Sequence, residues 1–197
     1  MLSPSSTNQF RNPSHAGFGL IELLVTIGIM LLVTTVILVR HTSFNSAILL
    51  RNQAYSVAFS IREAQQQAVS VVGQSSQFRQ AFGVHLRAQE ASFPTFRDVN
   101  GNDFYDPGTD AVFGAPGQMD PRFRVREIRT YSGGVESTTQ VLSITFIRPN
   151  FDARFKTAAA GDLLDAERVE IEIEIADSPA RRLIEVTNTG QISVRTP

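Results

Sequence analysis

Residues 17–39 read GFGLIELLVTIGIMLLVTTVILV, and this stretch decides how the rest of the chain is organised. From Phe18 to Val39 the run holds a single charged side chain, that of Glu22. A helix needs about 20 apolar residues to cross the hydrocarbon core of a bilayer. We therefore expect residues 18–39 to form a membrane-spanning helix.

Glu22 has two interpretations on physical grounds alone. It lies close to one end of the run, where a carboxylate can reach the polar interface of the membrane and is tolerated. Alternatively, it has a dedicated partner inside the membrane or in an assembly, as ionisable groups in membrane segments usually do. The residue pattern leaves both interpretations open.

The segment Gly17-Phe18-Gly19-Leu20-Ile21-Glu22-Leu23-Leu24 resembles the processing site of type IV pilins and pseudopilins. The resemblance implies that a prepilin peptidase cuts between Gly17 and Phe18 and that the new amino terminus of Phe18 is methylated. Glu22 is then the fifth residue of the mature chain. The resemblance also implies that Glu22 pairs with the Phe18 amine of a neighbouring subunit, which offsets two charges that are each costly alone and sets the axial register between helices.

The order of the N-terminal segments separates this chain from secreted proteins. A secretory signal peptide carries its apolar region before the cleavage site, whereas here the apolar region follows residues 1–17. The resemblance implies a cytoplasmic leader over 1–17, a single pass through the bacterial inner membrane, and a C-terminal domain in the periplasm or at the cell surface. It also implies three kinds of partner: other pilin or pseudopilin subunits, the prepilin peptidase and an inner-membrane assembly platform.

Composition limits the remaining functions. The 197 residues carry a formal net charge of −1 and no cysteine. Near-neutral charge argues against nucleic acid as a partner. Without cysteine there is no thiol catalyst and no cysteine zinc site. Many type IV pilins close a C-terminal loop with a disulfide, so the missing cysteines favour a minor pilin or a pseudopilin.

Residues 40–73 continue as an amphipathic helix. Apolar residues recur at steps of three and four, the spacing of one helix face, at Leu50, Ala54, Val57, Ile61, Ala64, Ala68 and Val71. Thr42, Ser43 and Asn45 could loosen the junction with the membrane helix. Gly73 is a suitable C-terminal cap.

Residues 74–197 are rich in strand patterns. We expect strands over 81–89, 92–97, 122–131, 141–148, 168–176, 183–186 and 192–194. In 168–176 the alternation of Val and Ile with Glu170, Glu172 and Glu174 predicts apolar residues facing the core and glutamates on a solvated face that protects against edge pairing. Strands following one long helix predict an α+β fold with an antiparallel sheet, which is pilin-like.

Three further segments resemble the H-type pseudopilins of type II secretion and the related FimT-like minor pilins. These segments are Arg51–Val71, Phe146–Asn150 and Ile184–Ile192. The resemblance implies a minor subunit of a type II secretion or type IV pilus filament.

The loop 98–110, DVNGNDFYDPGTD, carries an oxygen-bearing side chain at almost every second residue. Such spacing can direct several oxygens at one Ca²⁺ ion. Asp98, Asn100, Asn102 and Asp106 match positions 1, 3, 5 and 9 of the calcium loop motif, and Asp110 could supply a further ligand. Asp103 replaces the usual glycine, so a metal-free turn rich in Asp, Asn and Gly is the competing interpretation.

Residue patterns for catalysis are missing from the sequence. Of the three histidines, His85 stands alone on an expected strand and is expected to be structural or on the surface. The sequence contains no nucleophile elbow, phosphate loop or zinc-protease motif. The arginines at 122, 124, 126, 129, 181 and 182 could form a basic patch, although a solvated sheet face is the simpler interpretation.

Two functions of different kinds follow. The first is a prepilin-like structural subunit that polymerises through its N-terminal helix. The second is a membrane-anchored extracytoplasmic binding protein, dependent on calcium or binding DNA, that does not polymerise. Neither is an enzyme. Removal of residues 1–17 and dependence on Glu22 separate the first from the second.

Overall fold

The computed structural model describes residues 17, 19–70, 80–114, 117–176 and 179–197, and for 39–45 it describes the helical backbone alone. The chain divides into two compact units, Met1–Ser43 and Phe44–Pro197. Helix α1 (Leu20–Ser70) contributes its first part to one unit and its last part to the other. Phe18, Val71 and Gly73 lie outside the described residues, so the expected helix ends at these positions are not tested.

The second unit has the α+β fold that the sequence predicts, and every strand pair is antiparallel. The first five-stranded sheet, here the β1 sheet, has the order β4 (Ala111–Val112), β3 (Thr95–Arg97), β1 (Phe82–Arg87), β8 (Val141–Phe146), β9 (Ala153–Lys156). The second, here the β10 sheet, has the order β12 (Ile192–Arg195), β11 (Arg181–Thr187), β10 (Arg168–Ile175), β6 (Phe123–Ser132), β7 (Val135–Thr139). A short pair joins β2 (Ser92–Phe93) and β5 (Gly117–Gln118).

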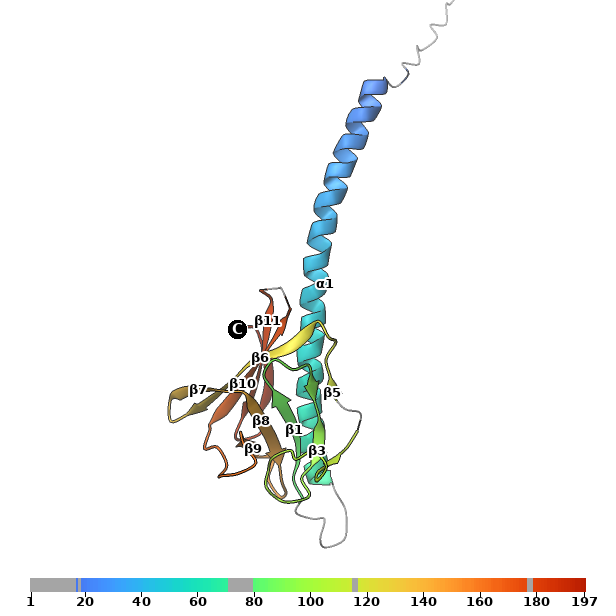
Figure 1. Ribbon diagram of the computed structural model, residues 1–197. Helices are drawn as coiled ribbons and strands as arrows, with labels where there is room; N and C mark the ends of the chain where they lie inside the picture. The colour runs from blue at the N-terminus through green and yellow to red at the C-terminus, as the bar shows by residue number, and fades with distance from the viewer. Residues whose placement is uncertain (1–16, 18, 71–79, 115–116, 177–178) are drawn as a thin grey trace, which may run out of the picture. The chain divides into compact units, whose positions relative to one another are not determined.

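One hydrophobic core joins α1 to both sheets (Figure 1). The expected apolar stripe of the helix is confirmed, because Leu50, Ala54, Val57, Ile61, Ala64 and Ala68 are all buried. The β1 sheet adds Val84, Leu86 and Ile144, and the β10 sheet adds Val125, Ile171 and Ile184. The small alanines of the stripe allow the helix backbone to lie close to the strands.

Two expectations about the glutamates of β10 are wrong. The strand is central, between β11 and β6, so its glutamates do not protect an edge. Their side chains are also not solvated: Glu170 is 5% exposed, Glu172 4% and Glu174 9%. The alternation itself is confirmed, since Val169, Ile171 and Ile173 face the core. The sequence pattern places the glutamates on the second face but does not show what covers that face.

The loop 98–110 between β3 and β4 lies against the side of the β1 sheet opposite the core. Ring contacts join Phe104 and Tyr105 of the loop to His85 of β1, with centroids 5.1 and 5.4 Å apart. On the same face, Gly83 permits the close packing of β1 with its neighbours β8 and β3, because a Cβ atom there would lie 2.4 Å from the Ile144 carbonyl oxygen and 3.1 Å from the Phe96 ring. The loop is therefore part of the packed domain.

The packing of α1 predicts how two neighbouring substitutions differ. Ile61 is fully buried, whereas Phe59 is 68% exposed. Replacing a buried isoleucine by alanine costs about 2–5 kcal/mol. We expect Ile61→Ala to lower the thermal midpoint of the full-length protein in detergent by several degrees, and Phe59→Ala to change it little. Equal effects of the two variants would contradict the assigned burial.

Candidate functional site

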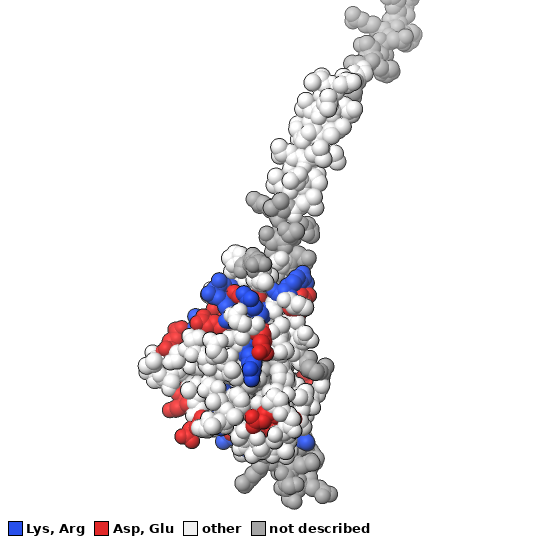
Figure 2. Space-filling view, in the orientation of Figure 1, with Lys and Arg blue, Asp and Glu red and all other residues white. Residues whose placement is uncertain are grey.

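The apolar part of α1 is not buried by any other part of the chain that the structure describes. Residues Leu20–Leu38 have a mean hydropathy of 2.5, and none of that window is buried. In Figure 2 the corresponding segment shows no charged side chain on the face drawn. Thr26, Thr34 and Thr35 donate their hydroxyls to helix carbonyls three or four residues earlier, so these polar groups are satisfied in hydrocarbon. The helix is long and apolar enough to be a single-pass membrane anchor.

Glu22 lies in the first turn of this helix and is exposed. The helix begins at Leu20, with the amides of Glu22 and Leu23 donating to the Gly19 carbonyl at 3.0 and 3.2 Å. An acidic side chain in a first turn is favoured by the positive end of the helix dipole. Gly17 is exposed, whereas the position of Phe18 lies outside the described residues. No ion-pair partner of Glu22 is found among the described residues, so any partner must come from elsewhere.

The side chains predicted to bind calcium are brought together, but as a hydrogen-bonded cluster. Both carboxylate oxygens of Asp98 accept loop amides, from Gly101 at 2.7 Å and from Asp103 at 2.7 Å. Asp106 accepts the side-chain amides of Asn100 and Asn102, at 2.8 and 2.6 Å. Within the described residues, no group of three or more His, Cys, Asp or Glu side chains converges as metal ligands.

The carboxylates of the same cluster also organise the loop backbone. Asp110 accepts the amides of Val99 and Asp106, at 2.9 and 2.8 Å. Asp103 takes the position of the usual calcium-loop glycine and has the same left-handed backbone, with φ of 60°. Burial raises the pKa of Asp98, against the lowering effect of the N–H donors of Asp103 and Gly101.

Asp103 fastens the loop to the β1 sheet. It accepts hydrogen bonds from the Thr145 hydroxyl at 2.8 Å and from Arg154 at 2.9 Å. Beside it, the Lys156 ammonium donates to the Asn102 carbonyl at 2.6 Å. Since cations and hydroxyls of the sheet hold it, the loop has a protein-built anchor, which the residue spacing did not reveal.

His85 and Ser143 form a pair beneath this loop. The His85 Nδ1 and Ser143 Oγ atoms are 2.8 Å apart, and the Tyr105 amide donates to the same Oγ. His85 is 3% exposed and Ser143 0%. Because neither side chain reaches solvent, the pair is structural, as the sequence predicts for His85.

Four of the six arginines that could form a basic patch, Arg124, Arg126, Arg129 and Arg181, are paired with the buried glutamates. Of the other two, Arg122 pairs with Asp120, and Arg182 forms no ion pair among the described residues. Glu172 accepts Arg126 and Arg129 at 2.9 Å and Arg181 at 3.1 Å. Glu174 accepts Arg124 at 2.8 Å. Charged groups of both signs are interspersed over the domain in Figure 2. On this face the arginines are partly solvated and cover the buried glutamates, and their pairing argues against a basic patch.

The same pairing continues toward the free end of β12. Glu170 accepts Arg195 at 2.6 Å and the Tyr131 hydroxyl at 3.0 Å. The Arg168 guanidinium lies 4.0 Å from the centre of the Tyr131 ring. Burial and the bond to Glu170 raise the pKa of Tyr131. With its cations held in pairs, this surface has little free positive charge for DNA.

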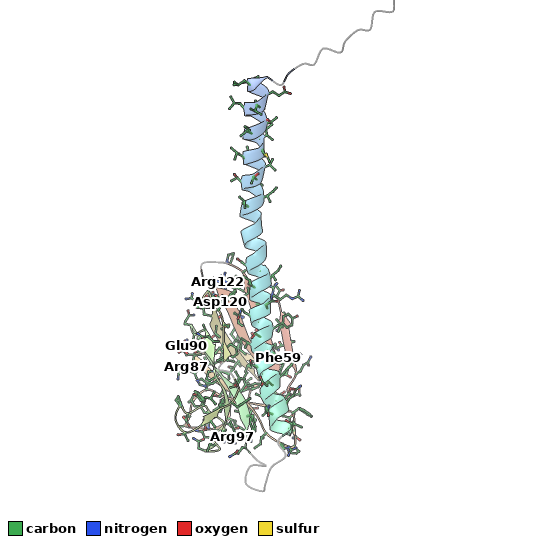
Figure 3. The ribbon with its side chains drawn as sticks, turned by 90° about the vertical axis from the view of Figure 1, so that its right-hand side faces the viewer. Phe59, Arg87, Glu90, Arg97, Asp120 and Arg122 are labelled. Atoms are coloured by element: carbon green, nitrogen blue, oxygen red, sulfur yellow. The ribbon has the colours of Figure 1, made fainter. Side chains whose placement is uncertain are left out.

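Sequence reasoning missed an exposed aromatic pair on α1. Tyr55 and Phe59 lie one helical turn apart and are 48% and 68% exposed; Figure 3 labels Phe59 on the helix. The sequence signal for this pair is its spacing of four residues, which also occurs in the core stripe, but these two aromatic residues lie on the opposite face of the helix. A helix face with aromatic residues in solvent marks a candidate interaction surface.

Comparison with known proteins agrees with the resemblance of the N-terminal segment. The model of the prokaryotic N-terminal methylation motif matches residues 12–38. This motif is typical of type IV pilin-like proteins, which are structural subunits, and indicates the prepilin-like class of pilins and pseudopilins. It implies processing by prepilin peptidase and assembly with other pilin subunits. No curated protein and no solved structure gives a match to the chain.

Calcium binding by the loop stays a prediction with a direct test. At a Ca²⁺ concentration 100 times Kd, binding would stabilise the fold by about 2.7 kcal/mol, which corresponds to a rise in the thermal midpoint of roughly 5–10 °C. If the prediction is correct, Asp106→Asn reduces this rise. An unchanged midpoint of the wild-type protein in millimolar Ca²⁺ would leave the hydrogen-bonded cluster as the complete description.

Acidification should destabilise the domain through His85. Burial, aided by the Arg87 guanidinium and opposed by Asp106, lowers the pKa of His85 to about 4. Between the ordinary value of 6.5 and pH 4, the unfolded chain binds this proton and the native protein does not. The free energy of unfolding therefore falls in this window as the pH falls, by up to about 3 kcal/mol.

The matched control for this prediction is His85→Gln, which does not titrate. We expect the difference in stability between wild type and His85→Gln to decrease from pH 7 to pH 4 in denaturant titrations of the full-length protein. A difference that is constant across the window would contradict the assigned pKa.

Proposed function

We propose that the chain is a minor subunit, an H-type pseudopilin or a FimT-like minor pilin, of a type II secretion or type IV pilus filament. The observation that carries this proposal is the methylation motif at 12–38, which leads into an apolar helix with no buried residue. An apolar surface of this length requires lipid or other helices as its surroundings. A subunit that moves from membrane to filament exchanges one apolar environment for the other.

In this proposal, Glu22 makes the packing of helices in the filament specific. After cleavage behind Gly17, the amine of Phe18 is a cation at the start of an apolar helix. Placing it in a bundle of helices is costly unless a carboxylate lies beside it. Glu22 of an adjacent copy is that carboxylate, so the pair forms only when two copies have the correct axial offset.

Topology and partners follow from the same proposal. Residues 1–17 are a cytoplasmic leader, residues 18–39 cross the inner membrane, and the domain of residues 74–197 lies in the periplasm or at the cell surface. The prepilin peptidase, the inner-membrane assembly platform and other pilin-like subunits are the partners. The missing cysteines support a minor subunit over a major pilin with a disulfide-closed loop.

The alternative is a membrane-anchored binding protein that does not polymerise. Its DNA-binding form loses support, because most arginines of the β10 sheet are paired with Glu170, Glu172 or Glu174. Its calcium-dependent form depends on the loop test described above. Neither form requires loss of residues 1–17 or a role for Glu22.

The mature N-terminus and one substitution test the proposal together. Mass spectrometry of the native protein should find a chain that begins at a methylated Phe18. Glu22→Ala should still insert and be processed, while its incorporation into filaments falls roughly tenfold or more, since an uncompensated charge remains in the bundle. Glu90→Ala, which removes a carboxylate of the β domain, is the control and should assemble normally. A native protein that begins at Met1, or normal assembly of Glu22→Ala, would overturn the proposal.

A further inference from the structure

A groove lies between α1 and β12, on the side of the helix away from the core. It consists of two adjoining hollows of about 350 and 250 Å³ that share Tyr55 and Val194. Phe59 and Ala58 line the first hollow, and Arg51 lines the second. We call this the α1–β12 groove.

The groove is lined by the exposed rings of Tyr55 and Phe59 and by three arginines, Arg51, Arg62 and Arg182, which we call the rim arginines. Arg51 lies 5.5 Å from the centre of the Tyr55 ring, and Arg62 donates to the Ile192 carbonyl at 3.0 Å. Arg182 lines the same end as Arg51. Among the described residues no carboxylate forms an ion pair with these three arginines, whereas Arg195, which lines the same hollow as Arg51, is paired with Glu170 and Glu185. The groove therefore suits an apolar side chain next to a carboxylate.

The chain itself displays such a pair at Phe151 and Asp152, between β8 and β9. The Phe151 side chain is 54% exposed, and Asp152 is also exposed. The backbone of this segment is nevertheless held, because Gln65 of α1 donates to the Phe151 carbonyl at 3.0 Å. Exposed side chains on a fixed backbone make a preorganised contact. We call Phe151 and Asp152 the knob.

The knob and the groove lie on one seam at different heights. Strand β12 follows α1, since Gln65 donates to the Gly190 carbonyl and Arg62 to that of Ile192. The knob adjoins Gln65, whereas the groove is centred on Tyr55 and Phe59. Six to ten residues of helix separate them, which corresponds to about 9–15 Å along the axis. A second copy displaced along the helix axis can bring its knob to this height.

We propose that the Phe151–Asp152 knob of one copy docks in the α1–β12 groove of the next copy. Phe151 enters the hollow beside Phe59, and Asp152 meets the rim arginines. A contact between two different patches adds copies in one direction, and it gives an open filament when the rotation between successive copies does not close into a ring. This inference rests on the proposed function and names the contact between β domains that would accompany the pairing of Glu22.

Cysteine crosslinking tests the contact, because the chain contains no natural cysteine. Two differently tagged full-length copies carry Phe151→Cys and Phe59→Cys, and both positions are exposed. A short bismaleimide should give dimers that contain both tags, and neither variant alone should give dimers. Val135→Cys with Phe59→Cys is the control, since Val135 is 64% exposed but lies in β7, and should not crosslink.

A cysteine in the apolar helix separates failure of this contact from failure of the proposed function. Leu31→Cys reports assembly of the helices, whatever the β domains do. If Leu31→Cys gives crosslinked dimers and the pair Phe151→Cys and Phe59→Cys does not, the docking contact is wrong and the proposed function stands. If neither gives crosslinked dimers, the proposed function fails and the contact fails with it. Crosslinking of Phe59→Cys to a different protein, in place of the second copy, would also overturn the inference.

Charge exchange tests the role of the rim. Asp152→Arg should lower the yield of the Phe151–Phe59 crosslink roughly tenfold, because like charges then face each other. Arg62→Glu in the opposite copy should restore it. A yield that does not respond to Asp152→Arg would remove Asp152 and Arg62 from the contact.

Discussion

The structure depends on one constraint: the predominantly apolar segment Leu20–Leu38 of α1, with a mean hydropathy of 2.5, has no buried member. Burial of apolar surface is the main favourable term in folding and association. Here the chain meets that demand for the second part of its helix, through the stripe from Leu50 to Ala68, and leaves the first part to its surroundings. The second part of the helix is therefore packed within the folded domain, whereas the apolar side chains of the first part are not buried by the described chain. In the proposed filament, the Glu22 carboxylate distinguishes a bundle of helices from lipid, because only a neighbouring copy brings it the Phe18 amine.

In the β domain, buried carboxylates form ion pairs with nearby arginines. Glu172 lies under three arginines that come from β6 and β11, so the central strand can carry carboxylates at 4–9% exposure. Such carboxylates are stable in a fold only with partners. The rim arginines near Tyr55 have no such partner among the described residues. This contrast separates the paired charges of the β10 sheet from the rim arginines of the α1–β12 groove, where we propose that a second copy docks.

Much of the fold follows from the sequence because periodicity reports burial. The stripe of α1 and the alternation in β10 each show which residues face the core. Periodicity does not predict the short polar strand β7 (VESTT) or strand β9, since both have few apolar residues in alternation. Periodicity also does not reveal that the glutamates of β10 are buried and paired, because their arginine partners in β6 lie some 40–50 residues away in the sequence. The anchor at Asp103 is similarly formed by Thr145 and Arg154, which only the tertiary fold brings near.

The fastening of the loop 98–110 has a consequence for how the domain matures. The polar contacts that hold this loop are hydrogen bonds and ion pairs: Asp98 accepts loop amides, and Asp103 accepts donors of the β1 sheet. None of them requires an oxidant, and the chain offers no thiol to one. The domain can therefore acquire its final form without a disulfide-forming catalyst, and reducing surroundings leave it intact.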